Sequence, residues 1–298
     1  MKRREMLRST GAALVGLSAF PFGWTAAAEK KKKQKVLYFT RSAGFEHSPV
    51  HREGDELSHS EKILIELGKR AGFEVECTKD GRVFDGDLGQ YAAIAFYTCG
   101  DLTRPESKDG APPMSPEGKQ KLIDAVAAGK GFVGFHSATD TFHSPGDRNA
   151  VQTELDPYVA MIGGEFIKHG RQQVATMRVT SPSFPGLSGA GRSFELNEEW
   201  YALKNFAKDM HVILVQETEG MVDNCYQRPP FPATWARRHG SGRVYFTSLG
   251  HREDVWTNPM IQEIFLGGFA WAMGNVDAEL VPNLDEVTPQ ASVLSPEL

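Results

Sequence analysis

The sequence predicts an α/β protein in which a mostly parallel, doubly wound sheet forms a single domain. Strand-like and helix-like segments alternate through the first half of the chain, which is typical of parallel sheets covered by helices on both faces. The chain has 298 residues, enough for one large α/β domain. No internal repeat and no obvious linker divides it further. We therefore expect one domain over residues 36–275 and a surface tail over residues 276–298.

Residues 1–28 have the features of an export signal. They combine a basic start, an apolar middle and small residues that suit a cleavage site. Arg3 and Arg4 resemble the start of a twin-arginine signal. This pattern predicts a periplasmic or secreted protein that keeps no stable membrane span after cleavage, and an uncleaved anchor is the alternative. The lysine-rich residues 29–35 are expected to form a solvated linker.

The first half of the domain contains four short apolar runs and two amphipathic segments. We expect strands at residues 35–40, 73–79, 92–98 and 132–136. Ser58 is a candidate N-cap for a helix that ends near residue 72. Ser115, followed by proline at the first helical position, begins a second helix that ends at Gly129. A further helix is expected to begin at the bend after the fourth strand.

The second half is more mixed. Strands are expected at residues 173–180, 211–218 and 242–251, with a loop over residues 181–191 between the first two. An amphipathic helix over residues 258–274 closes the domain. The residues after Gly274 are punctuated by proline and are expected to wrap the surface.

Charge and cysteine content exclude several classes of protein. The net charge is −5 at pH 7, and the first 28 residues are basic, so the remainder is more acidic still. An acidic chain is a poor partner for nucleic acid, whereas a neutral substrate or a cation suits it. The three cysteines form no CxxC or CxxCH motif, which excludes a zinc ribbon and a covalent c-type haem.

Several histidines and carboxylates follow the predicted strands. In open α/β sheets, ligands bind beyond the carboxyl ends of the strands. His47 lies in the loop after the first strand, and His136 lies at the bend after the fourth. If a helix begins at that bend, Asp140 shares a face with His136. Such a pair can ligate a metal, or the acid can orient the imidazole.

A second group of candidate residues comes from the later part of the chain. His169 follows a short strand-like segment, and Glu199 stands beside Trp200 and Tyr201. A carboxylate next to aromatic rings fits sugar recognition, since flat rings pack against sugar C–H surfaces. We therefore expect Trp200 and Tyr201 to bind substrate. The alternative is that both rings are core residues.

Together these residues predict a metal site with catalytic groups. His251 ends a strand, and Glu253 lies two residues later as a candidate orienting acid. A mixed histidine and carboxylate set suits a divalent ion, with zinc among the candidates. The predicted metal ligands are His47, His136, Asp140, His169 and His251. The predicted catalytic residues are His136, Glu199 and His251.

Five motifs resemble the trehalose-utilisation (ThuA-like) family. They are "GFVGFHSATDTF", "GGEFIKH", "EEWY", "PATWARRHGSGRVYFTSLGHREDVWTNP" and "GFAWAMG", and the similarity covers Val36–Gly274. The resemblance implies a flavodoxin-like fold related to that of class I glutamine amidotransferases. Those enzymes carry a nucleophilic cysteine at the strand-to-helix bend, and a His-x-Glu motif later in the chain completes their catalytic triad. The chain keeps His251 and Glu253, but His136 stands where the cysteine would be. Glutaminase chemistry is therefore not expected.

The resemblance also implies a role in disaccharide catabolism, with trehalose and 3-keto sugars as the substrate class. Three hypotheses remain open on the sequence. The first is a metal-assisted enzyme that acts on a disaccharide or a 3-keto sugar. The second is a metal-free glycoside hydrolase that pairs Glu199 with Asp140 or Glu253. The third is a sugar-binding or regulatory module without catalysis.

Overall fold

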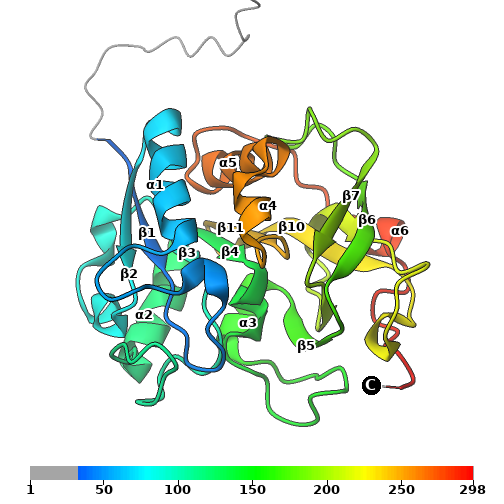
Figure 1. The fold of residues 1–298 in the computed structure, drawn as a ribbon, viewed down its shortest axis with the longest axis horizontal. Coiled ribbons are helices and arrows are strands. Elements are labelled where there is room, and N and C mark those ends of the chain that lie inside the picture. The colour runs from blue at the N-terminus through cyan, green and yellow to red at the C-terminus, as the bar shows by residue number, and fades with distance from the viewer. Residues whose placement is uncertain (1–32, 298) are drawn as a thin grey trace, which may run out of the picture. The chain divides into compact units, whose positions relative to one another are not determined.

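The computed structural model describes residues 33–297. The predicted export signal and most of the predicted linker lie outside these residues. The described residues form a nine-stranded sheet of order β2-β1-β3-β4-β11-β10-β9-β6-β7, together with a two-stranded sheet of β5 and β8. Helices cover both faces of the large sheet (Figure 1). The predicted α/β class and doubly wound arrangement are confirmed.

One half of the large sheet is parallel. Its strands pair in the order β2-β1-β3-β4-β11. Each corresponds to a strand that the sequence predicts. Their bounds are Lys35–Phe39 for β1, Glu74–Thr78 for β2, Ala93–Phe96 for β3, Gly131–Phe135 for β4 and Gly242–Thr247 for β11.

The other half of the sheet is antiparallel, from β11 through β10, β9 and β6 to β7. Across the whole sheet all strands except β10 and β6 run in one direction, because each antiparallel step reverses the previous one. The sequence predicts strands where β6 and β9 form and a strand-like segment where β5 forms, but it does not predict β7, β8 or β10. The bounds are Glu165–His169 for β5, Gln173–Val179 for β6, Ser193–Glu198 for β7, Tyr201–Lys204 for β8, His211–Gln216 for β9 and Phe231–His239 for β10.

Helices α1 and α2 begin at the capping residues that the sequence indicates. Ser58 caps α1 through a reciprocal capping box with Glu61, and Ser115 accepts a hydrogen bond from the Gly118 backbone N–H at the start of α2. The α-helices are α1 His59–Ala71, α2 Pro116–Ala127, α3 Pro157–Ile162, α4 Glu253–Thr257, α5 Pro259–Ala272 and α6 Leu284–Val287. Short 3-10 helices occupy Ser48–Val50, Gly81–Asp85, Leu88–Gln90, His136–Asp140 and Asn224–Tyr226.

The helix predicted after β4 does not form. The chain makes only the 3-10 helix His136–Asp140 and is extended at Thr141. Thr141 forms a bridge with Gly100, and the Gly100 N–H donates to the Asp140 carbonyl at 2.7 Å. These contacts with the loop after β3 compete with the helical hydrogen bonds. The prediction of an α-helix at this bend is therefore wrong.

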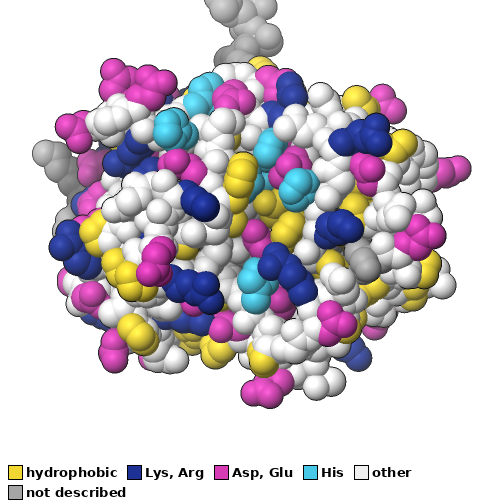
Figure 2. Space-filling model, turned by 60° about the horizontal axis from the view of Figure 1, so that its bottom comes forward, with side chains coloured by type: hydrophobic (Ala, Val, Ile, Leu, Met, Phe, Trp, Pro, Cys, Tyr) yellow, Lys and Arg dark blue, Asp and Glu magenta, His cyan; other side chains and the backbone are white. Residues whose placement is uncertain are grey.

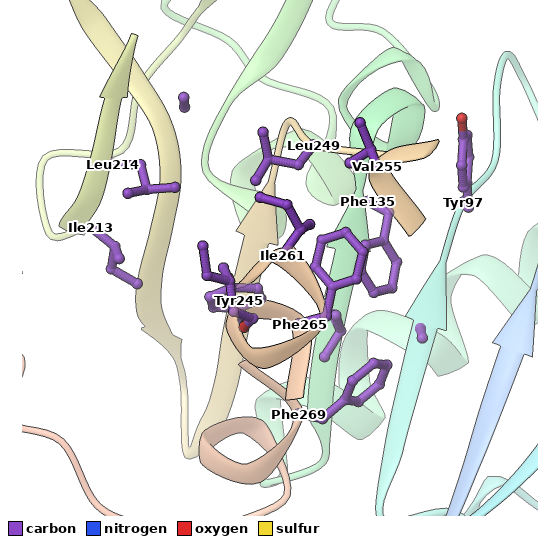
Figure 3. Packing of buried hydrophobic residues seen from close by; sticks show 14 of the residues in the cluster. Tyr97, Phe135, Ile213, Leu214, Tyr245, Leu249, Val255, Ile261, Phe265 and Phe269 are labelled. Atoms are coloured by element: carbon purple, nitrogen blue, oxygen red, sulfur yellow. Dashed lines mark hydrogen bonds between the residues drawn. The ribbon is translucent and has the colours of Figure 1, made fainter. Parts of the chain in front are cut away.

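Two apolar clusters hold the helices against the two faces of the sheet. Alternate residues of β1 divide between them: Val36 and Tyr38 join one cluster, and Leu37 and Phe39 join the other. The first cluster includes residues of α1 and α5, and Figure 3 shows Phe265 and Phe269 of α5 over Phe135 of β4. This packing fixes the strand ends from which the site is built.

The residues after Gly274 pack against the domain, with Leu284 and Ala291 buried. The Arg228 guanidinium donates to the Ala291 carbonyl at 2.6 Å. Within residues 33–297, no helix has both the length and the apolar character that a membrane crossing requires.

Candidate metal centre

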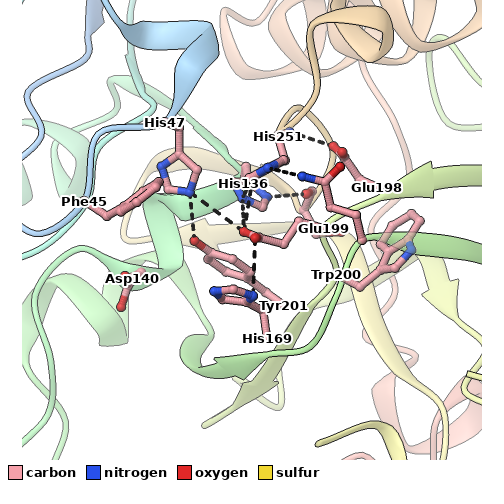
Figure 4. A network of polar contacts seen from close by, with 12 residues as sticks. Phe45, His47, His136, Asp140, His169, Glu198, Glu199, Trp200, Tyr201 and His251 are labelled. Atoms are coloured by element: carbon pink, nitrogen blue, oxygen red, sulfur yellow. Dashed lines mark hydrogen bonds and ion pairs between the residues drawn. The ribbon is translucent and has the colours of Figure 1, made fainter. Parts of the chain in front are cut away.

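Four side chains from distant parts of the sequence meet beyond the carboxyl ends of the parallel strands. They are His47 in the loop after β1, His136 after β4, Glu199 between β7 and β8, and His251 after β11. One ligand atom from each lies within 4.8 Å of all the others. Figure 4 shows the three imidazoles directed toward the Glu199 carboxylate. Because β4 and β11 are neighbours, the sheet itself brings His136 and His251 together.

The Oε2 atom of Glu199 is the common point of this cluster. It lies 3.1 Å from His251 Nδ1, 3.4 Å from His136 Nε2 and 3.9 Å from His47 Nε2. The His251 Nδ1 and His136 Nε2 atoms are 3.2 Å apart. Three imidazole nitrogens and one carboxylate oxygen form a donor set that suits a zinc ion or a similar divalent ion.

A backbone contact determines which nitrogen of His136 is available. Its Nδ1 lies 3.0 Å from the Ser248 carbonyl oxygen, which can only accept, so Nδ1 carries the hydrogen. The Nε2 lone pair of the neutral ring therefore faces the Glu199 carboxylate. Two acceptors at this distance repel unless a hydrogen-bond donor or a cation lies between them, and this role can be taken by a metal ion or by the N–H of His251, whose Nδ1 lies 3.2 Å from His136 Nε2 and 3.1 Å from Glu199 Oε2. A carbonyl behind the imidazole is also the usual support of a metal-bound histidine.

The backbone of His136 is held in a strained conformation. Its φ angle is 40°, in the left-handed region that residues with a side chain seldom adopt. Such a conformation costs about 1–3 kcal/mol and persists only where the surroundings impose it. The strain accompanies complete burial of the side chain and its direction into the cluster. We interpret it as the cost of placing this imidazole at the sheet edge.

The protonation states favour metal binding. Burial and the neighbouring imidazoles hold the pKa of His47 well below its ordinary value, and burial lowers the pKa of His136. Although burial opposes ionisation of Glu199, hydrogen bonds with His136 and His251 hold its pKa far below its usual range. Neutral imidazoles and an ionised carboxylate are the forms that bind a divalent cation.

Tyr201 and His169 complete the surroundings of Glu199. The Tyr201 hydroxyl lies 3.2 Å from His47 Nε2, and its ring lies 4.2 Å from the His136 ring between centroids. Only 3% of Tyr201 is exposed, so it forms a wall of the site. His169 Nδ1 contacts the other oxygen of Glu199, Oε1, at 3.2 Å, and its side chain is 45% exposed. His169 therefore lies beside the four-residue cluster, on its open side.

Trp200 is a core residue, and its predicted role in substrate binding is corrected. The side chain has no exposed surface, and its indole N–H donates to the Gln173 carbonyl at 2.8 Å. Figure 4 shows the ring turned away from the Glu199 carboxylate. A ring without exposed surface has no face on which a sugar can stack. Neighbouring residues of an extended chain point in opposite directions, which explains why Glu199 and Trp200 separate.

Asp140 is not brought to the cluster. Its carboxylate oxygens lie 3.1 Å from Cys99 Sγ, 2.7 Å from an Arg148 nitrogen and 3.0 Å from His143 Nε2. The predicted alignment with His136 required an α-helix at the bend, which the 3-10 helix replaces. With Asp140 engaged in this way, the pairing of Glu199 with Asp140 in the metal-free hydrolase hypothesis gains no support.

His143 joins Asp140 to Glu165 in a network that the sequence analysis did not identify. Its Nδ1 lies 3.2 Å from Glu165 Oε1, and the buried Lys204 ammonium is 3.9 Å from the same oxygen. Although burial opposes protonation, hydrogen bonds with Asp140 and Glu165 raise the pKa of His143 above 6.5. The imidazolium links the loop after β4 to β5.

This network predicts a pH-dependent contribution to stability. Because the folded-state pKa of His143 is raised, its contribution is fully present below pH 6.5 and is lost as the pH rises through the folded-state value. The His143→Gln variant should be less stable than the wild type by about 1 kcal/mol at pH 6, and the difference should shrink by pH 9. Urea unfolding of both proteins at the two pH values measures this. An equal difference at both pH values would contradict the assignment.

Glu198 anchors the loop that carries His251, and the sequence analysis missed it. Its carboxylate accepts the backbone N–H groups of Gly250 and His251 at 2.6 Å each and that of Arg252 at 3.2 Å. Burial raises the pKa of Glu198 to about 8, and the backbone donors oppose this rise. The alternation of Phe194, Leu196 and Glu198 on one face of β7 is a signal that could have revealed its burial.

Glu253 does not play the part expected from the His-x-Glu motif. It is the first residue of α4, and the cluster carboxylate that contacts the His251 imidazole is Glu199. The orienting acid of this histidine therefore comes from the β7–β8 connection.

Fold and site together define an α/β protein with a flavodoxin-like, glutamine amidotransferase-like fold and a histidine on the bend after β4. The profile of the ThuA family, described as trehalose utilisation, matches residues 35–272. The chain belongs to this family.

Solved structures of ThuA-like proteins share the fold. A putative ThuA-like protein from Bacteroides uniformis is 19% identical with a TM-score of 0.58, over 84% of this chain and 95% of its own. A second, from Parabacteroides merdae, is 17% identical with a TM-score of 0.58, over 89% of this chain and 97% of its own. A search of curated proteins gave no significant match.

Proposed function

We propose that this ThuA-family protein is a metal-dependent enzyme of carbohydrate catabolism that acts on a disaccharide or a 3-keto sugar derivative. The observation that carries the proposal is the convergence of His47, His136, His251 and Glu199 within 4.8 Å. The donor chemistry fits a divalent ion, because three imidazole nitrogens and one ionised carboxylate are directed at a single point.

The four clustered side chains would hold the ion. When bound, a divalent ion supplies Lewis acidity, which polarises a sugar carbonyl or hydroxyl group. A ketone at C3 acidifies the adjacent C–H groups, so elimination, isomerisation or hydrolysis of such a sugar needs only a modest base. His169 lies on the open side of Glu199, where its imidazole can accept or return a proton. The buried Tyr201 hydroxyl lies 3.2 Å from His47 Nε2, so it borders the space that the ion would occupy.

The predicted export signal places this activity outside the cytoplasm. Its support is the composition of residues 1–28, with Arg3 and Arg4 at the start. Fractionation of the source cells tests this part of the proposal. Recovery of the full-length chain in the cytoplasmic fraction alone would contradict it.

The decisive experiment measures metal and turnover together. We expect the purified protein to contain about one equivalent of a divalent metal and to convert a 3-keto disaccharide. A strong chelator should abolish the conversion, and zinc or another divalent ion should restore it. A protein that turns over the sugar without metal would favour the paired-carboxylate hydrolase. Saturable, metal-independent sugar binding without turnover would favour the non-catalytic module.

A further inference from the structure

A cleft of about 720 Å³ adjoins the candidate metal centre. It reaches the centre at His251, passes Phe45 and Ser48, and ends at the first turn of α1 with His59 and Lys62. Small-molecule sites commonly have volumes of about 300–1,000 Å³, so this cleft can hold more than one sugar ring. Figure 2 shows histidine and acidic side chains gathered near hydrophobic ones on one face of the molecule.

Phe45 is an exposed aromatic ring on a fixed loop. The side chain is 59% exposed, although its neighbour His47 is buried. The backbone N–H groups of Ala43 and Gly44 donate to the Cys99 carbonyl at 2.8 and 2.9 Å, and the Phe45 N–H donates to Cys99 Sγ at 3.4 Å. A loop tied in this way presents the ring without a further loss of conformational freedom on binding.

The Phe45 ring packs against one of the predicted metal ligands. The Phe45 and His47 rings meet edge to face, with centroids 4.9 Å apart. Figure 4 shows Phe45 beside His47 at the rim of the cluster. A ligand group bound at the metal centre therefore has a flat apolar surface within one sugar ring's length.

The remaining lining indicates a neutral, hydroxyl-rich ligand. Glu53, Glu56, His59 and Lys62 provide hydrogen-bonding groups of both signs, and Lys62 is paired with Glu56 at 3.3 Å. The lining also includes Glu46, so its three glutamates outnumber its one lysine and an anionic ligand would be repelled. A polyol with an apolar C–H face matches both the mixed polar wall and the exposed ring.

We propose that this cleft is the subsite for the second ring of a disaccharide and that Phe45 is the platform on which that ring stacks. The proposal rests on the proposed function, because it assumes that the reacting ring lies at the metal centre. It assigns to Phe45 the role that the sequence analysis gave to Trp200.

The test compares a disaccharide with a single ring. We expect wild-type protein to bind trehalose more tightly than methyl α-glucoside in calorimetric or NMR titrations. Phe45→Ala should weaken trehalose binding by about tenfold, the equivalent of about 1.4 kcal/mol, and change methyl α-glucoside binding by less than about twofold. Phe45→Trp, which keeps an aromatic face, should retain the preference. Val281→Ala removes an equally exposed apolar side chain elsewhere and should change neither affinity.

Zinc affinity measured on the same variants separates the two proposals. Phe45→Ala should bind zinc as the wild type does. If it does and the preference for trehalose is unchanged, the subsite is wrong while the metal centre stands. If the wild type binds neither zinc nor another divalent ion yet Phe45→Ala selectively loses trehalose, the subsite stands and the metal-dependent enzyme fails. Equal loss of both sugars in Phe45→Ala would also overturn the subsite.

Discussion

Replacing His136 by alanine should weaken zinc binding by at least about 100-fold and abolish metal-dependent turnover. Loss of a residue that only supports a ligand typically costs 10–100-fold in metal affinity, and loss of a ligand should cost at least as much. His136 would contribute its Nε2 atom to the ion directly, with Nδ1 fixed by the Ser248 carbonyl. Its removal leaves two imidazoles and one carboxylate.

Competition with a chromophoric chelator measures this effect, and circular dichroism reports whether the variant is folded. His239→Ala is the matched control, because His239 ends β10 and lies outside the four-residue cluster. It should bind zinc with the affinity of the wild type. If His136→Ala, correctly folded, kept its zinc affinity within about threefold, the metal centre described here would not exist.

The parallel half of the fold could be predicted from sequence because its signals are local. Four of its strands are short and mostly buried, and only the edge strand β2 is partly exposed. Ser58 and Ser115 mark helix starts by chemistry that acts within one turn. The antiparallel half carries weaker signals. In β7 only Phe194 and Leu196 alternate with polar residues, and the half-exposed strand resembles a loop.

The residues of the candidate site also differ in how far the sequence could predict their positions. His136 and His251 could be predicted to meet, because each ends a strand of a parallel sheet and such ends share one edge. Glu199 was predicted from its residue type and neighbours, whereas its approach to the three histidines depends on the turn between β7 and β8. The prediction for Asp140 was wrong because the chain forms a 3-10 helix after β4 where an α-helix was expected. In a segment this short, the sequence pattern does not distinguish the two kinds of helix.

The loop after β11 shows why a residue outside the cluster matters. The Gly250 carbonyl accepts hydrogen bonds from Tyr97 at 3.0 Å and from Trp256 at 2.8 Å. The backbone N–H groups of residues 250–252 donate to Glu198. The position of the His251 imidazole is therefore set by the buried carboxylate and two aromatic side chains, which is the kind of support that holds a functional group in place.

Glu198→Ala should accordingly destabilise the protein by about 3–5 kcal/mol, because three backbone N–H groups lose their acceptor. A buried unsatisfied group costs about 1–3 kcal/mol, and the N–H groups of His251 and Arg252, which are only partly buried, are at the lower end of this range. Glu198→Gln keeps one acceptor oxygen and should cost less.

Glu195→Ala is the control, since Glu195 is on the same strand and faces solvent. Urea unfolding measures all three. The alanine variant should also bind zinc more weakly, because His251 is released with its loop. A Glu198→Ala protein as stable as Glu195→Ala would show that water replaces the carboxylate and that Glu198 does not position His251.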